Sequence, residues 1–175
     1  SLYLATEGDK WGYLSLSQKL RDRHEDTINQ LLKPGPDRET VLLAANKLLD
    51  QHVEICNAVN ILGEASPRII DSVVSFGERL SSRMIAAALR GNGVNARAFD
   101  AGSFLRTDDT HQNAQPLWDE TEKRITRDLV PQINSGIVPV ITGFIGAAPD
   151  ESITTLGRGG SDYSAAIFAA YADSE

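Results

Sequence analysis

The sequence is poor in cysteine, in aromatic residues and in positive charge. Its one cysteine, Cys56, excludes an intrachain disulfide, and its apolar setting indicates a small buried side chain rather than a nucleophile. Lysine and arginine number 17 against 24 aspartate and glutamate residues, which gives a formal net charge of −7. This balance argues against nucleic acid or a membrane as a partner, because both reward basic patches.

Long apolar runs are also missing, since none approaches the roughly 20 residues that span a bilayer. No signal peptide is visible, and the expected location is the cytoplasm, or a plastid if the chain comes from a plant. The three histidines, His24, His52 and His111, show no metal-ligand spacing, so we expect no metal ligands among them. The acidic pair Asp108–Asp109 is typical of a loop that turns on Asx hydrogen bonds.

What is present fits one soluble globular domain: the chain has 175 residues, of which 41% are apolar and 23% are charged. Helical periodicity predicts helices over 14–32, 40–62, 67–91, 116–133 and 161–172. Ser66 is expected to cap the third helix and Asp37 the second. Strands are predicted over 94–99, 136–144 and 153–156, with a turn or hairpin loop over 147–152. This alternation favours an α/β fold with a mostly parallel sheet and a ligand site beyond the carboxyl ends of its strands.

Residues 153–162, Ile-Thr-Thr-Leu-Gly-Arg-Gly-Gly-Ser-Asp, are the most informative segment. Gly159 and Gly160 permit a tight turn and close approach of a ligand, and Ser161 or Asp162 can cap the helix that follows. A helix N-terminus attracts anions, and Arg158 adds a planar guanidinium suited to a carboxylate or phosphate. The segment is interpreted as an anion-binding loop, although its glycines and arginine alone also fit an ordinary capped turn.

Two further segments carry unusual glycines. Gly77 lies in a predicted helix, where glycine costs about 1 kcal/mol relative to alanine, and it invites close approach of a backbone or a ligand. Gly143 and Gly146 follow a predicted buried strand and would let their loop pack tightly. Because both this loop and the 156–162 loop follow strands, they are predicted to meet.

Together these segments resemble the aspartate kinases of the amino acid kinase superfamily. The match rests on Ser75-Phe-Gly-Glu-Arg-Leu-Ser-Ser82, on Val138-Pro-Val-Ile-Thr-Gly-Phe-Ile-Gly146 and on Thr154-Thr-Leu-Gly-Arg-Gly-Gly-Ser-Asp162, in family order. The resemblance implies a three-layer α/β/α fold with a mostly parallel sheet, incomplete at both ends. Residues 1–62 would form a helical region and residues 63–175 the aspartate-binding α/β part.

The resemblance also implies roles for individual residues. Glu78 would hold the substrate aspartate near its amino group, Phe144 would line the amino acid pocket, and Arg158 would pair with a substrate carboxylate. Thr155, Gly159, Ser161 and Asp162 would line the site near the amino acid and the transferred phosphoryl group. The reaction implied is ATP-dependent phosphorylation of the L-aspartate β-carboxylate with Mg²⁺, and the intact enzyme is expected to be a homo-oligomer.

The sequence departs from the family pattern in two places. The Lys-Phe-Gly-Gly loop, whose lysine contacts ATP phosphates in the family, is absent, and Ser152 replaces a common glycine. The chain is therefore expected to be an incomplete catalytic domain that is inactive alone. Two alternatives remain: a kinase for another amino acid or a carbamate, and a non-catalytic module that binds an amino acid or a partner subunit.

Overall fold

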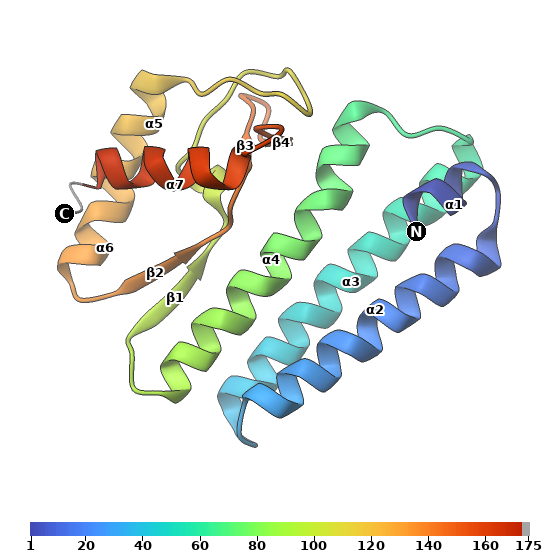
Figure 1. Cartoon of the computed structure of the whole chain (residues 1–175), viewed down its shortest axis with the longest axis horizontal. Helices are drawn as coiled ribbons and strands as arrows, with labels where there is room; N and C mark the ends of the chain where they lie inside the picture. The colour runs from blue at the N-terminus through green and yellow to red at the C-terminus, as the bar shows by residue number, and fades with distance from the viewer. Residues whose placement is uncertain (173–175) are drawn as a thin grey trace.

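The computed structural model describes residues 1–172, which form three layers (Figure 1). Helices α1 to α4 lie on one side, strands β1 and β2 lie next to α4, and helices α5 to α7 cover the other side. The three-layer α/β/α fold that the resemblance implied is confirmed.

The helical layer consists of α1 (Leu2–Thr6), α2 (Lys10–Leu31) and α3 (Pro36–Leu62), with α2 packed against α3. Helix α2 begins four residues before the predicted start, because the Asp9 carboxylate caps it by accepting from the Gly12 amide at 2.8 Å. The expectation that Asp37 caps the next helix is wrong. That helix starts at Pro36, whose ring suits the first helical position, and Asp37 lies inside its first turn.

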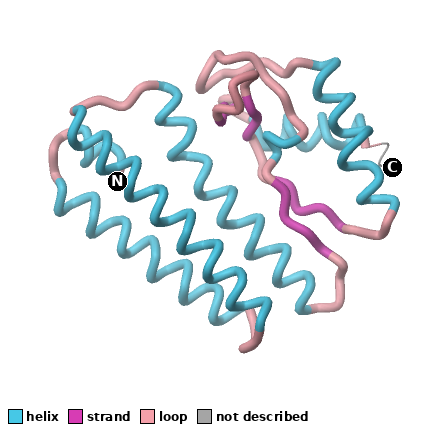
Figure 2. Tube along the Cα trace, turned by 180° about the vertical axis from the view of Figure 1, so that it is seen from behind, coloured by secondary structure: helices cyan, strands magenta, loops and turns pink. Residues whose placement is uncertain are grey.

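Helix α4 (Pro67–Gly91) is the central element of the molecule. Ser66 caps it as predicted, with its hydroxyl 3.4 Å from the Ile69 amide. One face packs against α3 and the other against β1, β2 and β4, as both views show (Figures 1 and 2). The helical layer and this helix share an apolar core formed by Ile28, Leu32, Val41, Ala45, Leu48, Leu49, Phe76, Leu80 and Ala87.

The strands form two separate pairs within the described residues. Strands β1 (Ala96–Phe99) and β2 (Val138–Ile141) are parallel, with Ala96 opposite Val138, whereas β3 (Ile145–Ala147) and β4 (Ile153–Thr155) form an antiparallel hairpin. The predicted loop over 147–152 is thus confirmed. The strand predicted over 136–144 is present but shorter, Val138–Ile141, and the left-handed Phe144, with φ +47°, turns the chain into the hairpin.

The third layer is made of α5 (Trp118–Arg124), a π-helical turn (Ile125–Leu129), α6 (Val130–Asn134) and α7 (Gly160–Tyr171). The predicted helix over 116–133 is divided because Pro131 has no N–H to donate within the helix. A 3₁₀ turn (Ala101–Ser103) follows β1. This layer and the hairpin share a second core: Ala101, Phe104, Leu105, Ile125, Leu129, Ile145, Leu156, Ile167 and Phe168.

Candidate functional site

The loop after β2 brings α4 and the start of α7 together. The amide of Gly143 donates to Oε2 of Glu78 at 3.1 Å. A Cβ atom placed on Gly143 would lie 3.0 Å from Oγ of Ser161 and 3.3 Å from the same Glu78 oxygen. Glu78 and Ser161, which are 83 positions apart, therefore flank one glycine, and only glycine leaves this approach unstrained.

Phe144 is fixed next to this glycine in a left-handed conformation. Its amide donates to the hydroxyl of Ser164 in α7 at 3.0 Å. A Cβ placed on Gly160 would lie 2.8 Å from the Phe144 Cβ. The predicted close packing of the 143–146 loop is thus confirmed, and it places Phe144 directly on the N-terminus of α7.

The glycine loop, residues 156–160, leads from β4 into α7. Gly157 and Gly159 have φ of +76° and +74°, which a side chain would strain. The predicted capping by Ser161 or Asp162 is wrong, because α7 begins at Gly160 with Gly159 as its cap residue and without a side-chain cap. The Gly160 amide donates to the Gly157 carbonyl at 3.1 Å, whereas the amides of Ser161 and Asp162 have no acceptor among residues 1–172 and remain for a ligand.

Arg158 projects from this loop with its charge unpaired. Its side chain is exposed, and within residues 1–172 it forms no hydrogen bond or ion pair. Ser161 and Asp162 are likewise exposed on the first turn of α7. A guanidinium, free helix amides and a glutamate thus lie on neighbouring segments, an arrangement that can bind a small molecule with both negative and positive groups.

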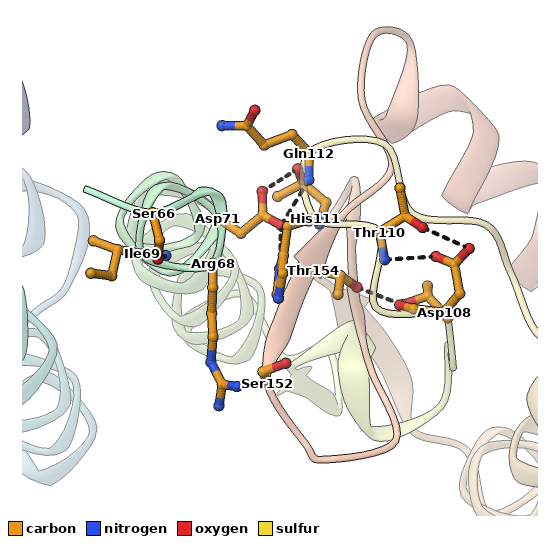
Figure 3. Close-up of polar contacts among 12 residues, drawn as sticks. Ser66, Arg68, Ile69, Asp71, Asp108, Thr110, His111, Gln112, Ser152 and Thr154 are labelled. Atoms are coloured by element: carbon orange, nitrogen blue, oxygen red, sulfur yellow. Dashed lines mark hydrogen bonds and ion pairs between the residues drawn. The ribbon is translucent and has the colours of Figure 1, made fainter. Parts of the chain in front are cut away.

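Thr155 is placed differently from the other candidate residues. It is buried at the end of β4, and its hydroxyl donates to Oδ1 of Asp71 at 2.7 Å. Because the one hydroxyl proton is used in this bond, Thr155 can offer a ligand only acceptor lone pairs. Figure 3 shows Asp71 of α4 facing His111 and Gln112 of the long loop after β1.

Several polar residues near the site were not recognised from the sequence. Asp71 is fully buried and shares a face of α4 with the buried Ser75 and Ser82, opposite Leu80, so the sequence shows only a polar helix face there and gives no signal for it. Asp100, directly after β1, accepts two hydrogen bonds from Arg83 at 3.0 and 3.1 Å. Arg79 and Asp100 line a hollow of about 210 Å³ beside β3, together with Gly102, Ser103, Ile145, Gly146, Ala147, Glu151 and Ile153.

Of the two neighbours expected for Gly77, a backbone or a ligand, the structure does not provide the backbone. A Cβ placed on this exposed residue would meet nothing within 4 Å, so no described backbone approaches it. Gly77 leaves open space on α4 directly beside Glu78. That space is available to a ligand.

Among residues 1–172, no group of three or more His, Cys, Asp or Glu side chains could hold a metal ion. Cys56 is fully buried, as predicted. The Asx interpretation also holds for Asp108: burial acts to raise its pKa, but hydrogen bonds from the Gln115 amide and from Thr110 lower it overall.

No helix in the described part of the chain has the length and apolar character needed to cross a bilayer.

The chain matches the family model of the amino acid kinase family over residues 12–175.

Known proteins with similar sequences are aspartokinases. Lysine-sensitive aspartokinase 3 of Escherichia coli is 35% identical over 129 residues, which cover 71% of this chain and 28% of that protein. The chloroplastic bifunctional aspartokinase/homoserine dehydrogenase 1 of Arabidopsis thaliana is 34% identical over 159 residues, 90% of this chain and 17% of that protein. The chain thus spans less than a third of the length of these relatives.

Similar solved structures agree with this result. E. coli aspartokinase III in complex with aspartate and ADP has a TM-score of 0.84 and 30% identity, over 97% of this chain and 36% of that one. The same enzyme in complex with lysine and aspartate has a TM-score of 0.85 and 27% identity, over 97% of this chain and 38% of that one. Because 97% of the chain is covered, the similarity includes the helical layer as well as the strands.

Proposed function

Since the chain belongs to the amino acid kinase family, we propose that it forms the amino acid binding part of an aspartate kinase. The reaction would be ATP-dependent phosphorylation of the L-aspartate β-carboxylate to 4-phospho-L-aspartate, which leads to lysine, threonine and methionine. The observation that carries this proposal is the convergence of Glu78 and Ser161 on Gly143, with the unpaired Arg158 on the adjoining loop.

The charges of these residues match those of aspartate. The substrate has one ammonium group and two carboxylates, so a site for it needs both an acidic and a basic side chain. In the proposed complex, Glu78 accepts from the ammonium group and Arg158 pairs with a substrate carboxylate. Phe144 lines the pocket, and Gly159 and Ser161 offer groups at the N-terminus of α7, where the helix dipole favours anions.

The proposed chemistry needs little from the protein beyond positioning. At neutral pH the β-carboxylate is already ionised, so no general base is required. Its oxygen attacks the γ-phosphorus of ATP, a new O–P bond forms, and the bond to the oxygen that bridges the β- and γ-phosphates breaks to release ADP. We assign Arg158 and Asp162 to the region of the transferred phosphoryl group, and Thr155 to the support of the loop that carries them.

Mg²⁺ would enter as part of the substrate Mg·ATP and neutralise phosphate charge. Mg²⁺ of this kind is held mainly by the ATP phosphates and water, with one or two carboxylates, so it does not need a cluster of three or more protein ligands. A related solved enzyme contains aspartate and ADP, and this supports a nucleotide as the second substrate. We further propose a cytoplasmic or plastid location and a homo-oligomeric intact enzyme.

The proposal is tested with the product of the complete reading frame that encodes the chain. ADP release from Mg·ATP is measured with L-aspartate, L-glutamate or carbamate as the acceptor, and we expect release with L-aspartate. Release with L-glutamate or carbamate instead would identify a different amino acid kinase. Binding of L-aspartate without ADP release would favour a non-catalytic amino acid binding module.

A further inference from the structure

A buried carboxylate on α4 has no part in the proposed chemistry. The side chain of Asp71 is 1% exposed and is surrounded by donors. Oδ2 accepts from Nδ1 of His111 at 2.9 Å, from the Gln112 amide at 2.9 Å and from the Thr155 amide at 3.3 Å, and Oδ1 accepts from the Thr155 hydroxyl. Because a carboxylate only accepts, Nδ1 of His111 carries its proton.

The donors belong to two segments that enclose the glycine loop. Thr155 immediately precedes that loop, and its carbonyl oxygen also accepts from the Ala114 amide at 3.0 Å. On the other side, a Cβ on Gly157 would lie 3.1 Å from the carbonyl oxygen of Gln112 and 3.1 Å from Oδ1 of Asn113. Asp71 therefore holds both the start of the glycine loop and the segment against which the loop packs.

The segment against which the glycine loop packs also contains a strained backbone residue. Gln112 has φ +69°, a left-handed conformation that costs a residue with a side chain about 1–3 kcal/mol and persists only where neighbouring contacts impose it. Two hydrogen bonds hold it: the Gln112 amide donates to Asp71 (Figure 3), and the Asn113 amide donates to the Thr110 carbonyl at 3.2 Å. Without Asp71, the left-handed conformation loses the only side-chain acceptor described for the Gln112 amide.

We propose that Asp71 is a positioning residue that sets the conformation of the glycine loop and so the affinity of the site for its amino acid. The part that concerns affinity rests on the proposed function. The carboxylate acts through Thr155 and Gln112 and touches no substrate. Its removal leaves four donors without their acceptor, two on the segment with His111 and Gln112 and two on Thr155.

Two substitutions, made in the product of the complete reading frame that encodes the chain, separate a positioning role of Asp71 from a merely structural role. In Asp71→Ala all four donors lose their acceptor. In Asp71→Asn the amide oxygen can occupy the place of Oδ2, and the amide nitrogen can donate to the Thr155 hydroxyl oxygen. Since the alanine variant risks misfolding, His111→Leu, which removes one partly exposed donor, serves as a milder change.

The first measurement is hydrogen exchange at the Gly160 amide, which donates to the Gly157 carbonyl at 3.1 Å and so reports the closed loop. We expect exchange to accelerate about tenfold or more in Asp71→Ala, less in His111→Leu, and by about threefold at most in Asp71→Asn. The matched control is Leu49→Ala, which destabilises the distant helical core and leaves exchange at Gly160 unchanged. Unchanged Gly160 exchange in both Asp71→Ala and His111→Leu, or equal acceleration in Leu49→Ala, would overturn the proposal.

The second measurement is the dissociation constant for L-aspartate, by calorimetry. We expect it to rise about tenfold or more in Asp71→Ala, with recovery in Asp71→Asn, because small misplacements of binding groups have large effects. If the unaltered chain does not bind L-aspartate, the proposed function fails while Gly160 exchange still decides the positioning role. If L-aspartate binds equally to Asp71→Ala and to the unaltered chain, the positioning role fails and the proposed function stands.

Discussion

At the scale of single residues, the two charged groups of the site differ in how far the protein already neutralises them. Glu78 accepts one hydrogen bond, from Gly143, whereas Arg158 has no partner among residues 1–172. An exposed guanidinium without a partner stays hydrated in the free protein. It gains an ion-pair partner when a substrate carboxylate binds. Arg158 is therefore the residue at which aspartate binding is most directly tested.

Replacing Arg158 with alanine should weaken the binding of L-aspartate by about 2 kcal/mol or more, because one substrate carboxylate would lose its partner. Isothermal titration calorimetry on the chain measures this change. Arg127→Ala is the matched control, since Arg127 is exposed and pairs with its neighbour Asp128 on the π-helical turn. Equal affinity in the Arg158 variant and the unaltered chain would reject the role assigned to Arg158.

Gly160→Ala should destabilise the fold by about 1–3 kcal/mol, the usual range for overpacking. The added methyl would meet the Cβ atoms of Phe144 at 2.8 Å and Leu156 at 3.1 Å, and neither can rotate away. Urea unfolding measures the loss. Gly91→Ala is the control, because a Cβ there would meet nothing within 4 Å. Equal stability of the two variants would contradict the close packing described for Phe144.

At the scale of elements, α4 connects the helical layer to the site. It carries Asp71 and Glu78 about two turns apart, and its opposite face packs against α3. The sequence predicted this helix and its Ser66 cap because periodicity, cap and proline agree. It did not predict the role of Asp71, because the partners of this carboxylate are up to 84 residues away in a loop and a short strand.

Gly77→Ala separates the stability of α4 from ligand access to it. The substitution should stabilise the fold by up to about 1 kcal/mol, since alanine is the better helix former and the space beside Gly77 is open. If the amino acid occupies that space beside Glu78, the same substitution should weaken L-aspartate binding. Gly91→Ala, in the last turn of the same helix, provides the comparison. Unchanged affinity in Gly77→Ala would place the ligand elsewhere along α4.

Helix α3 contributes a dependence of stability on pH. Burial lowers the pKa of His52 below its ordinary value of 6.5, and its ring packs edge-on against Phe76. The unfolded chain therefore takes up a proton near pH 6.5 while the folded chain resists it. This contribution to stability is present above pH 6.5 and is lost as the pH falls below that value.

The free energy of unfolding should accordingly fall more steeply below pH 6.5 in the unaltered chain than in His52→Leu. The difference in slope is at most about 1.4 kcal/mol per pH unit, the limit for one proton. Urea titrations at several pH values between 5 and 7.5 measure both slopes. Equal slopes of unfolding free energy against pH in the two proteins would show that the pKa of His52 is not lowered in the folded chain.

At the scale of the whole molecule, local patterns predicted elements better than they predicted pairings. The long helices followed from their apolar periodicity, and the approach of the 143–146 and 156–162 loops followed from their place after strands. The end of the parallel strand at Ile141, before the hairpin that starts at Ile145, was missed because a left-handed Phe144 has no sequence signal. The caps expected from Ser161 and Asp162 failed because glycines at 159 and 160 start the helix earlier.

The candidate site was predicted through its resemblance to aspartate kinases rather than through spacing. Glu78 on α4 and Ser161 on α7 belong to segments far apart in the sequence, and only the fold brings them to Gly143. Thr155 was predicted to line the site from its motif. In the structure its hydroxyl donates a hydrogen bond to Asp71 instead. Residue types thus indicated the kind of ligand, and tertiary contacts decided which groups remain free to bind it.

The most direct test of this account is a titration of the isotope-labelled chain with L-aspartate, followed by the amide NMR signals. We expect saturable shifts at Gly143, Phe144, Gly159 and Ser161, and weaker binding of succinate, which lacks the ammonium group that Glu78 is proposed to hold. In Glu78→Gln the preference for L-aspartate over succinate should shrink. Shifts confined to other parts of the chain, or equal binding of both ligands, would contradict the claim that these segments form one aspartate site.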